Sequence, residues 1–323
     1  MEIVSTFERV HQKLAEAQAQ RQISDDALRG SLHSWCLSAD IFGPPPSDPF
    51  SDEYKAHQLE LYQQIANKPY DLSNEETVFD FDRELERPYP YGTQSASTVG
   101  SSLIGYGWLI QKMNLPAGST ILEIGSGYGP LTVHLAQMGY QVTCLDISQP
   151  LLDFVKARTG GQIETICGDM VTVPINGRFD AVIFNASLHH SLEHQSVIDR
   201  LETIVAPEGV VVFMAEPITN WWSKIVPHPW SVRLDGLSVW TMHQFGWLEL
   251  GFQKGYFVKL VTAAGWHLTH YNLGHASQTD VWIASRQKRR DSRLTWHSRL
   301  QGYSFPLDTA VINITHKVAN LLK

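Results

Sequence analysis

The chain has 323 residues, 43% of them hydrophobic, and a formal net charge of −8 at pH 7. A nucleic-acid partner would require a basic face, so this acidic balance argues against one. The three cysteines lie far apart in the sequence and have no metal-ligand spacing, which indicates a reducing compartment without a disulfide framework. No stretch reads as a signal peptide or a membrane span. We therefore expect a cytoplasmic protein that binds neither nucleic acid nor membrane.

Residues 1–98 are predicted to form a helical cap. Apolar residues recur at helical spacing at Ile3, Phe7, Val10 and Leu14. Ser24 and Ser51 are suited to begin the next two helices, because a serine side chain satisfies a free backbone N–H at a helix start. Ser73 and Glu76 have the spacing of a capping box, which predicts a fourth helix.

The stretch 121–148 has the pattern of a strand, a glycine-rich turn, a helix and a second strand. Its turn contains Gly125, Gly127 and Gly129, which allow the backbone to turn sharply and to approach a ligand. The second strand ends at Asp146, where an acid suits the two hydroxyls of a ribose. We expect a nucleoside-binding half of a doubly wound sheet, with Ile147 beside that acid.

The order of acid and glycines in residues 123–129, E-x-G-x-G-x-G, resembles motif I of the class I S-adenosylmethionine-dependent methyltransferases. A dinucleotide-binding turn would place its third glycine one residue later. The resemblance implies that Glu123 faces the amino end of the methionine moiety of the cofactor, S-adenosyl-L-methionine. It extends over residues 103–285 and implies a seven-stranded, mainly parallel sheet in the order 3-2-1-4-5-7-6.

Further cofactor contacts follow from this resemblance. Asp169 and Met170 end the third strand, where the family holds the adenine, so the carboxylate is expected to accept from the exocyclic amine. Tyr91 lies in a segment that often folds over the cofactor in this family, and is expected near its methionine end. Asn185 ends the fourth strand and points toward the same crevice.

Three polar residues follow the fourth and fifth strands and are the catalytic candidates: His189, His190 and Glu216. Ligands of open α/β sheets bind at the carboxyl ends of the strands. Histidine is the side chain best suited to take a proton near neutral pH, so we favour His189 as the general base. Glu216 would orient it or bind an acceptor hydroxyl. No metal site is predicted, because no carboxylate at matching spacing completes the histidines.

The insertion at residues 216–255, after the fifth strand, is rich in tryptophan and is predicted to cover the acceptor. Its candidate contacts are Trp221, Trp222, Arg233 and Trp240. Aromatic faces with a few charged groups suit a sugar or another polyhydroxylated ring. The alternative is that these tryptophans fill the core between the cap and the sheet.

Three parts are therefore expected: the cap at 1–98, a methyltransferase domain at 99–286 and a tail helix at 287–323 that packs on the cap or mediates a homodimer. The predicted function is O-methylation of a sugar, glycan intermediate or other polyhydroxylated small molecule. N- or C-methylation of another metabolite is the alternative. A nicotinamide-dependent oxidoreductase and a non-catalytic binding module remain further readings.

Overall fold

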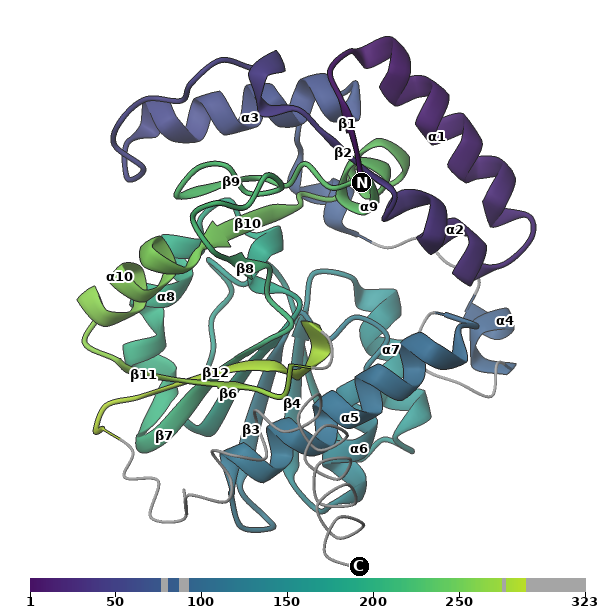
Figure 1. Cartoon of the computed structure of the whole chain (residues 1–323). Coiled ribbons are helices and arrows are strands. Elements are labelled where there is room, and N and C mark those ends of the chain that lie inside the picture. The colour runs from purple at the N-terminus through teal and green to yellow at the C-terminus, as the bar shows by residue number, and fades with distance from the viewer. Residues whose placement is uncertain (77–80, 87–92, 275–276, 289–323) are drawn as a thin grey trace, which may run out of the picture.

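The structure, a computed structural model, describes residues 1–76, 81–86, 93–274 and 277–288. A seven-stranded sheet in the order β11-β12-β7-β6-β3-β4-β5 lies at its centre (Figure 1). Its strands are β3 (Thr120–Ile124), β4 (Gln141–Asp146), β5 (Glu164–Cys167), β6 (Phe179–Asn185), β7 (Val205–Met214), β11 (His267–Asn272) and β12 (Asp280–Ser285). β12 is antiparallel to both of its neighbours, and the other pairs are parallel. The predicted order 3-2-1-4-5-7-6 is confirmed.

Helices cover both faces of this sheet, because successive side chains of a buried strand point to opposite faces. In β6, Ala181 and Ile183 belong to one buried cluster, while Val182 and Phe184 belong to the other. The first cluster is completed by α5 (Ala96–Met113), α6 (Pro130–Gln137) and α7 (Gln149–Arg158). The second contains α8 (His194–Ile204) and α10 (Lys254–Ala263). The sheet is therefore a closed middle layer, and a ligand can reach it only at a strand end.

The N-terminal residues form a mainly helical layer above the carboxyl ends of the strands (Figure 1). Its elements are β1 (Glu2–Val4), α1 (Phe7–Arg21), α2 (Asp25–Leu32), β2 (Trp35–Leu37), η1 (Ala39–Ile41), α3 (Asp52–Ala66), η2 (Leu72–Glu75) and α4 (Phe81–Glu86). Ser24 and Ser51 cap α2 and α3 as predicted. Ile3 lies in a short strand and not in the first helix, because Glu2–Val4 pairs with β2.

The predicted capping box at Ser73 and Glu76 is wrong. Asp71 is the N-cap instead, and its Oδ1 accepts from the backbone N–H of Ser73 at 2.9 Å. The turn that follows is the 3₁₀ helix η2, which ends at Glu75. Because the cap lies at Asp71, Glu75 is the last residue of the turn and Glu76 follows it.

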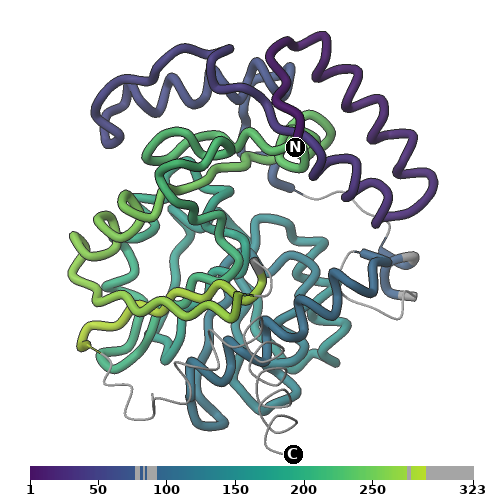
Figure 2. The backbone as a smooth tube through the Cα atoms, in the orientation of Figure 1, coloured from purple at the N-terminus to yellow at the C-terminus, as the bar shows by residue number. Residues whose placement is uncertain are grey.

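Residues of the tryptophan-rich insertion form a small sheet of their own. They comprise β8 (Ile218–Thr219), β9 (Trp230–Val232), α9 (Gly236–Gln244) and β10 (Leu250–Gln253), with β10 between the other two strands. The cap lies directly against this sheet (Figure 2). The phenol of Tyr54 donates to the carbonyl of Trp230 at 2.6 Å, and that of Tyr62 donates to the carbonyl of Gly246 at 2.5 Å. Cap and insertion therefore hold each other in place.

Two short 3₁₀ turns complete the described chain, η3 (Leu188–His190) and η4 (Ser277–Thr279). Within the described residues, no helix is both long and apolar enough to cross a membrane. The predicted tail helix and Tyr91 lie outside the described residues.

Candidate active site

The glycine loop between β3 and α6 has the backbone conformations that its sequence predicts. Gly125, Gly127 and Gly129 have φ angles of +71°, +53° and +68°. A Cβ on Gly125 would lie 2.5 Å from the Cβ of Ser187, and one on Gly129 would lie 2.5 Å from Cγ1 of Val155. Glycine is required at these two positions by both the turn and the close approach.

Asp146 ties this loop to the end of β4. Its Oδ2 accepts from the backbone N–H of Gly127 at 2.8 Å, and its Oδ1 accepts from that of Ser148 at 3.0 Å. Burial raises the pKa of Asp146, and the two backbone N–H groups offset part of that rise. Each carboxylate oxygen has a further lone pair for a ligand.

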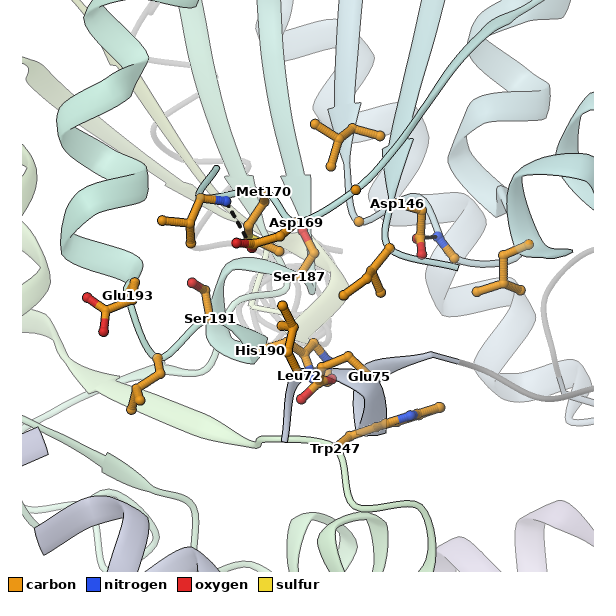
Figure 3. Close-up of a pocket in the computed structure, with 18 of the residues that line it drawn as sticks. Leu72, Glu75, Asp146, Asp169, Met170, Ser187, His190, Ser191, Glu193 and Trp247 are labelled. Atoms are coloured by element: carbon orange, nitrogen blue, oxygen red, sulfur yellow. Dashed lines mark hydrogen bonds and ion pairs between the residues drawn. The ribbon is translucent and has the colours of Figure 1, made fainter. Parts of the chain in front are cut away.

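A cleft of about 370 Å³ opens at the carboxyl ends of β3, β4, β5 and β6 (Figure 3). Six of the predicted cofactor residues line it: Gly125, Gly127, Asp146, Ile147, Asp169 and Met170. Leu72, Glu75 and Trp247, from the cap and the insertion, line it as well, with Trp247 well apart from Met170 and Asp169 (Figure 3). The cleft therefore has two ends. We call the end lined by Asp146, Asp169 and Met170 the cofactor end, and the end lined by Leu72, Glu75 and Trp247 the acceptor end.

Asp169 also holds the backbone of its own loop. Its Oδ1 accepts from the backbone N–H of Val171 at 3.0 Å, and its Oδ2 accepts from the hydroxyl of Thr172 at 3.1 Å. Arg200 of α8 holds the same loop, since its guanidinium donates to the carbonyl of Met170 at 2.6 Å. The loop is therefore shaped before any ligand binds.

Three other predicted cofactor residues do not line the cleft. Glu123 is 1% exposed and accepts from the hydroxyl of Thr132 at 2.6 Å, behind the glycine loop. Burial raises the pKa of Glu123 to about 7, with the Asp146 charge adding to the rise and Thr132 opposing it. Gly129 and Asn185 are likewise absent from the lining. For Glu123, the expected position at the cofactor's amino end is replaced by one in the core, because its side chain points from β3 into α6.

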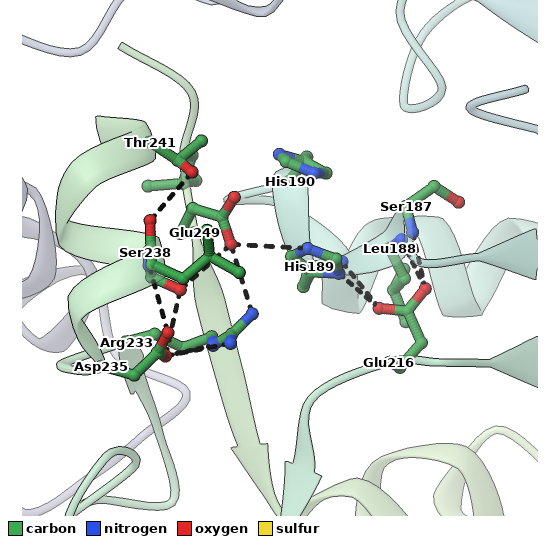
Figure 4. Close-up of polar contacts among 12 residues, drawn as sticks. Ser187, Leu188, His189, His190, Glu216, Arg233, Asp235, Ser238, Thr241 and Glu249 are labelled. Atoms are coloured by element: carbon green, nitrogen blue, oxygen red, sulfur yellow. Dashed lines mark hydrogen bonds and ion pairs between the residues drawn. The ribbon is translucent and has the colours of Figure 1, made fainter. Parts of the chain in front are cut away.

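Glu216 organises the turn that carries the histidines (Figure 4). Its Oε1 accepts from the backbone N–H groups of Ser187 and Leu188 at 2.8 and 2.9 Å, and its Oε2 accepts from that of His189 at 3.2 Å. Burial alone would raise the pKa of Glu216, but His189 and these N–H groups lower it overall. Its side chain is 0% exposed, so it orients this turn and does not meet an acceptor.

His189 is held between two carboxylates. Its Nδ1 lies 2.8 Å from Oε2 of Glu216, and its Nε2 lies 3.7 Å from Oε2 of Glu249. The side chain is 6% exposed, and His189 is not among the residues that line the cleft. The expectation that His189 is the base facing the acceptor therefore needs correction, because its ring is buried against the Glu216 carboxylate.

His190 is the histidine that lines the cleft. Its Nδ1 lies 3.3 Å from Oε2 of Glu75, and its ring is tilted by 35° against that of His189 at a centroid distance of 4.3 Å. Burial by itself would lower the pKa of His190, but Glu75, with smaller contributions from Glu249 and Glu216, raises it to about 9. The ring is therefore held against the Glu75 carboxylate.

The four predicted acceptor contacts do not line the cleft. Trp221 and Trp222 are 76% and 64% exposed and lie on the surface, where Trp222 borders a second pocket beside Trp282. Trp240 is 5% exposed and packs in the core, as the alternative expectation had it. Arg233 lies 2.9 Å from Asp235 and 3.3 Å from Glu249, so its charge is already satisfied.

The sequence reading missed the acceptor end. Trp247 was one of several tryptophans in the insertion, and nothing in the local pattern distinguished it. Glu75 lies beside Glu76, which the capping pattern had selected instead. Tyr70 and Leu72 come from the same connector and also line the cleft. Only the packing of the cap on the insertion brings these residues to the end of β6.

Comparison with known proteins agrees with this geometry. Residues 122–213 match the family model described as a methyltransferase domain. An uncharacterised methyltransferase of Mycobacterium tuberculosis is 34% identical over 123 residues, which cover 36% of this chain and 62% of the relative. An uncharacterised methyltransferase of Alkaliphilus oremlandii is 33% identical over 156 residues, covering 47% of this chain and 64% of the relative. The chain thus spans less than two thirds of these relatives.

Among solved structures, the chain is similar to the 1,6-didemethyltoxoflavin-N1-methyltransferase of Burkholderia thailandensis, with a TM-score of 0.48 and 15% identity. That match covers 76% of this chain and 94% of the other. The matched residues 122–213 include the glycine loop, Asp146 and the Asp169 loop. Residues 122–213 of this chain are therefore similar to a methyltransferase domain.

Proposed function

We propose that this protein transfers a methyl group from S-adenosylmethionine to a hydroxyl of a sugar, glycan intermediate or other polyhydroxylated small molecule. One observation carries the proposal: a single cleft joins the glycine loop to an acceptor end formed by Glu75, His190 and Trp247. Transfer requires the two reactants to be aligned and shielded from water, and the cap and insertion supply the walls for both.

The residues at the cofactor end fit the cofactor. Gly125 presents bare backbone at the bottom of the cleft, where a Cβ would already meet Ser187. Asp146 has lone pairs left for the ribose hydroxyls after its two backbone contacts. Asp169 and Met170 would hold the adenine. When bound, the cofactor supplies an electrophilic methyl group on its sulfonium.

The acceptor end favours a polyhydroxylated ring. Trp247 and Tyr70 offer aromatic faces to C–H surface, and the Glu75 carboxylate offers an acceptor for hydroxyl groups. Glu75 already accepts from the backbone N–H of Leu248 at 2.6 Å through Oε1 and pairs with His190 through Oε2. We assign it the acceptor's hydroxyl proton, because its carboxylate lines the cleft at the end where an acceptor would bind.

Calorimetry with S-adenosylhomocysteine and with NAD tests the cofactor. We expect binding of S-adenosylhomocysteine alone; binding of NAD alone would favour an oxidoreductase and contradict the proposal. Asp146→Ala should weaken S-adenosylhomocysteine binding by about 1.5–3 kcal/mol, the range for hydrogen bonds to a charged group. Asp153→Ala, an exposed acid on α7, is the matched control and should leave the affinity unchanged.

A methyl-transfer screen against nucleotide sugars, glycosides and phenols, read by mass spectrometry, tests the acceptor class. Methylation of a sugar hydroxyl is the expected product. A product methylated only at nitrogen or carbon would replace the proposal with the N- or C-methyltransferase alternative. Cofactor binding without any turnover across the panel would favour a non-catalytic module.

A further inference from the structure

The side chains of His189 and His190 lie close to that of Glu249, a residue distant from them in sequence (Figure 4). One ring nitrogen of His189, one of His190 and one carboxylate oxygen of Glu249 all lie within 4.8 Å of one another. Glu249 adjoins β10 of the insertion, far from the histidines in sequence, which is why spacing alone gave no carboxylate for this pair. His189 and Glu249 are 5% and 8% exposed.

Both histidines are oriented in the same way. Nδ1 of His189 is held by Glu216 at 2.8 Å, and Nδ1 of His190 faces Glu75 at 3.3 Å. Each ring therefore has Nε2 left for another partner, and that of His189 points to Glu249 at 3.7 Å, too far for a hydrogen bond. A carboxylate behind a histidine is the usual support of a metal-bound imidazole, because it fixes the ring and raises its basicity.

The charges around the pair leave room for a further cation. Three carboxylates face it, those of Glu75, Glu216 and Glu249. Among the described residues, the Arg233 guanidinium lies 3.3 Å from Glu249 but is shared with Asp235 at 2.9 Å. Excess buried negative charge is costly unless a cation compensates it.

We propose that His189, His190 and Glu249 bind a divalent first-row transition ion, with Mn²⁺ and Zn²⁺ as the ions best matched to two imidazoles and one carboxylate. Ligand atoms that share one ion at bonds of about 2.1 Å lie roughly 3–4 Å apart. Side-chain rotations that move the three ligand atoms by about 1 Å would bring them to this spacing.

His190 lines the cleft, so an ion held by it would lie beside the acceptor end. An acceptor hydroxyl bound there would be held in place and made more acidic by the ion. This role rests on the proposed function, whereas the site itself rests on the geometry of the three side chains. The two are therefore tested by different titrations.

The test is a calorimetric titration of the EDTA-treated full chain with MnCl₂ and, separately, with ZnCl₂, without acceptor or cofactor. Wild type should bind one ion per chain. Glu249→Gln and His189→Gln should each weaken binding by at least the roughly 10–100-fold that loss of a ligand's supporting partner costs. His270→Gln, which removes a histidine paired with Asp280 at the second pocket, is the matched control and should bind as wild type does.

Absence of stoichiometric binding by wild type overturns the site. So does binding that survives both Glu249→Gln and His189→Gln, or that is lost in His270→Gln. A titration with S-adenosylhomocysteine checks that each variant is folded. If Glu249→Gln and His189→Gln both fail that check, ion binding by His190→Gln tests the site in their place, and undiminished binding by it overturns the site. Ion binding without any S-adenosylhomocysteine binding in wild type would leave the site standing and overturn the proposed function.

Discussion

The two ends of the cleft are built in different ways. The cofactor end is formed mostly by one stretch, 121–148, and is held by local hydrogen bonds such as that from the backbone N–H of Gly127 to the carboxylate of Asp146. The acceptor end combines Glu75 from the cap, His190 from η3 and Trp247 from the insertion, held by side-chain contacts between segments distant in sequence. A local motif thus positions the cofactor, while the acceptor end depends on two added layers staying packed.

Glu216→Ala should produce the largest effect, because it breaks the contact on which the acceptor end depends most. The turn of His189 would lose its acceptor for three backbone N–H groups and its partner for the imidazole. Removing one partner of a buried pair costs about 3–5 kcal/mol. Urea unfolding monitored by circular dichroism measures the loss. Glu164→Ala, an exposed acid on β5, should change the free energy of unfolding by less than about 0.5 kcal/mol.

Gly125→Ala tests the cofactor end by the same measurement. The new Cβ would meet Ser187 at 2.5 Å and force a left-handed conformation on alanine. Overpacking of about 1–3 kcal/mol and strain of about 1 kcal/mol together predict a loss of about 2–4 kcal/mol and no measurable S-adenosylhomocysteine binding. In Gly118→Ala the φ of +85° is equally strained, but nothing lies within 4 Å, so only the strain should appear. Equal losses in the two variants would show that the contact with Ser187 is unimportant.

Glu123→Gln should remove a pH dependence of the free energy of unfolding that arises at the cofactor end. Burial raises the folded pKa of Glu123 to about 7, above the 4.5 of a solvated glutamate. The unfolded chain therefore releases this proton at lower pH, and wild-type stability falls as pH rises between these two values. The variant should lack this fall and be more stable than wild type by on the order of 2–3 kcal/mol at pH 8, with little difference at pH 4. Urea unfolding midpoints of both proteins across that pH range measure this difference. Parallel curves of midpoint against pH would contradict the assignment.

Trp247→Ala should give the smallest effect, confined to the acceptor end. Trp247 lines the cleft and packs on Phe245 with a ring-centroid distance of 4.8 Å. Loss of its aromatic face should raise the acceptor KM several-fold, or about 1 kcal/mol, while S-adenosylhomocysteine affinity stays within a factor of two. Trp222→Ala, at an exposed position outside the cleft, should change neither quantity. The opposite result would return the acceptor site to the exposed tryptophans.

The sequence alone was sufficient for the sheet and most of the cofactor end. The motif at residues 123–129 carries the family resemblance that implied the strand order, and six of the residues predicted to contact the cofactor line the cleft. The glycine turn itself depends on local geometry, because a turn with positive φ has the same shape wherever it occurs. Glu123 departs from the expectation because its orientation depends on packing against Thr132 in α6.

Only the tertiary structure decided the acceptor end. The insertion's composition identified an aromatic surface but did not distinguish Trp247, in the cleft, from Trp240, in the core, and Trp222, on the surface. The His189–His190 pair was visible in the sequence, yet which ring faces the cleft follows from Glu216 and Glu75, which hold the rings on different sides. Side-chain direction in a turn and contact between distant segments are set by the whole packed core, because each depends on atoms that the local sequence does not contain.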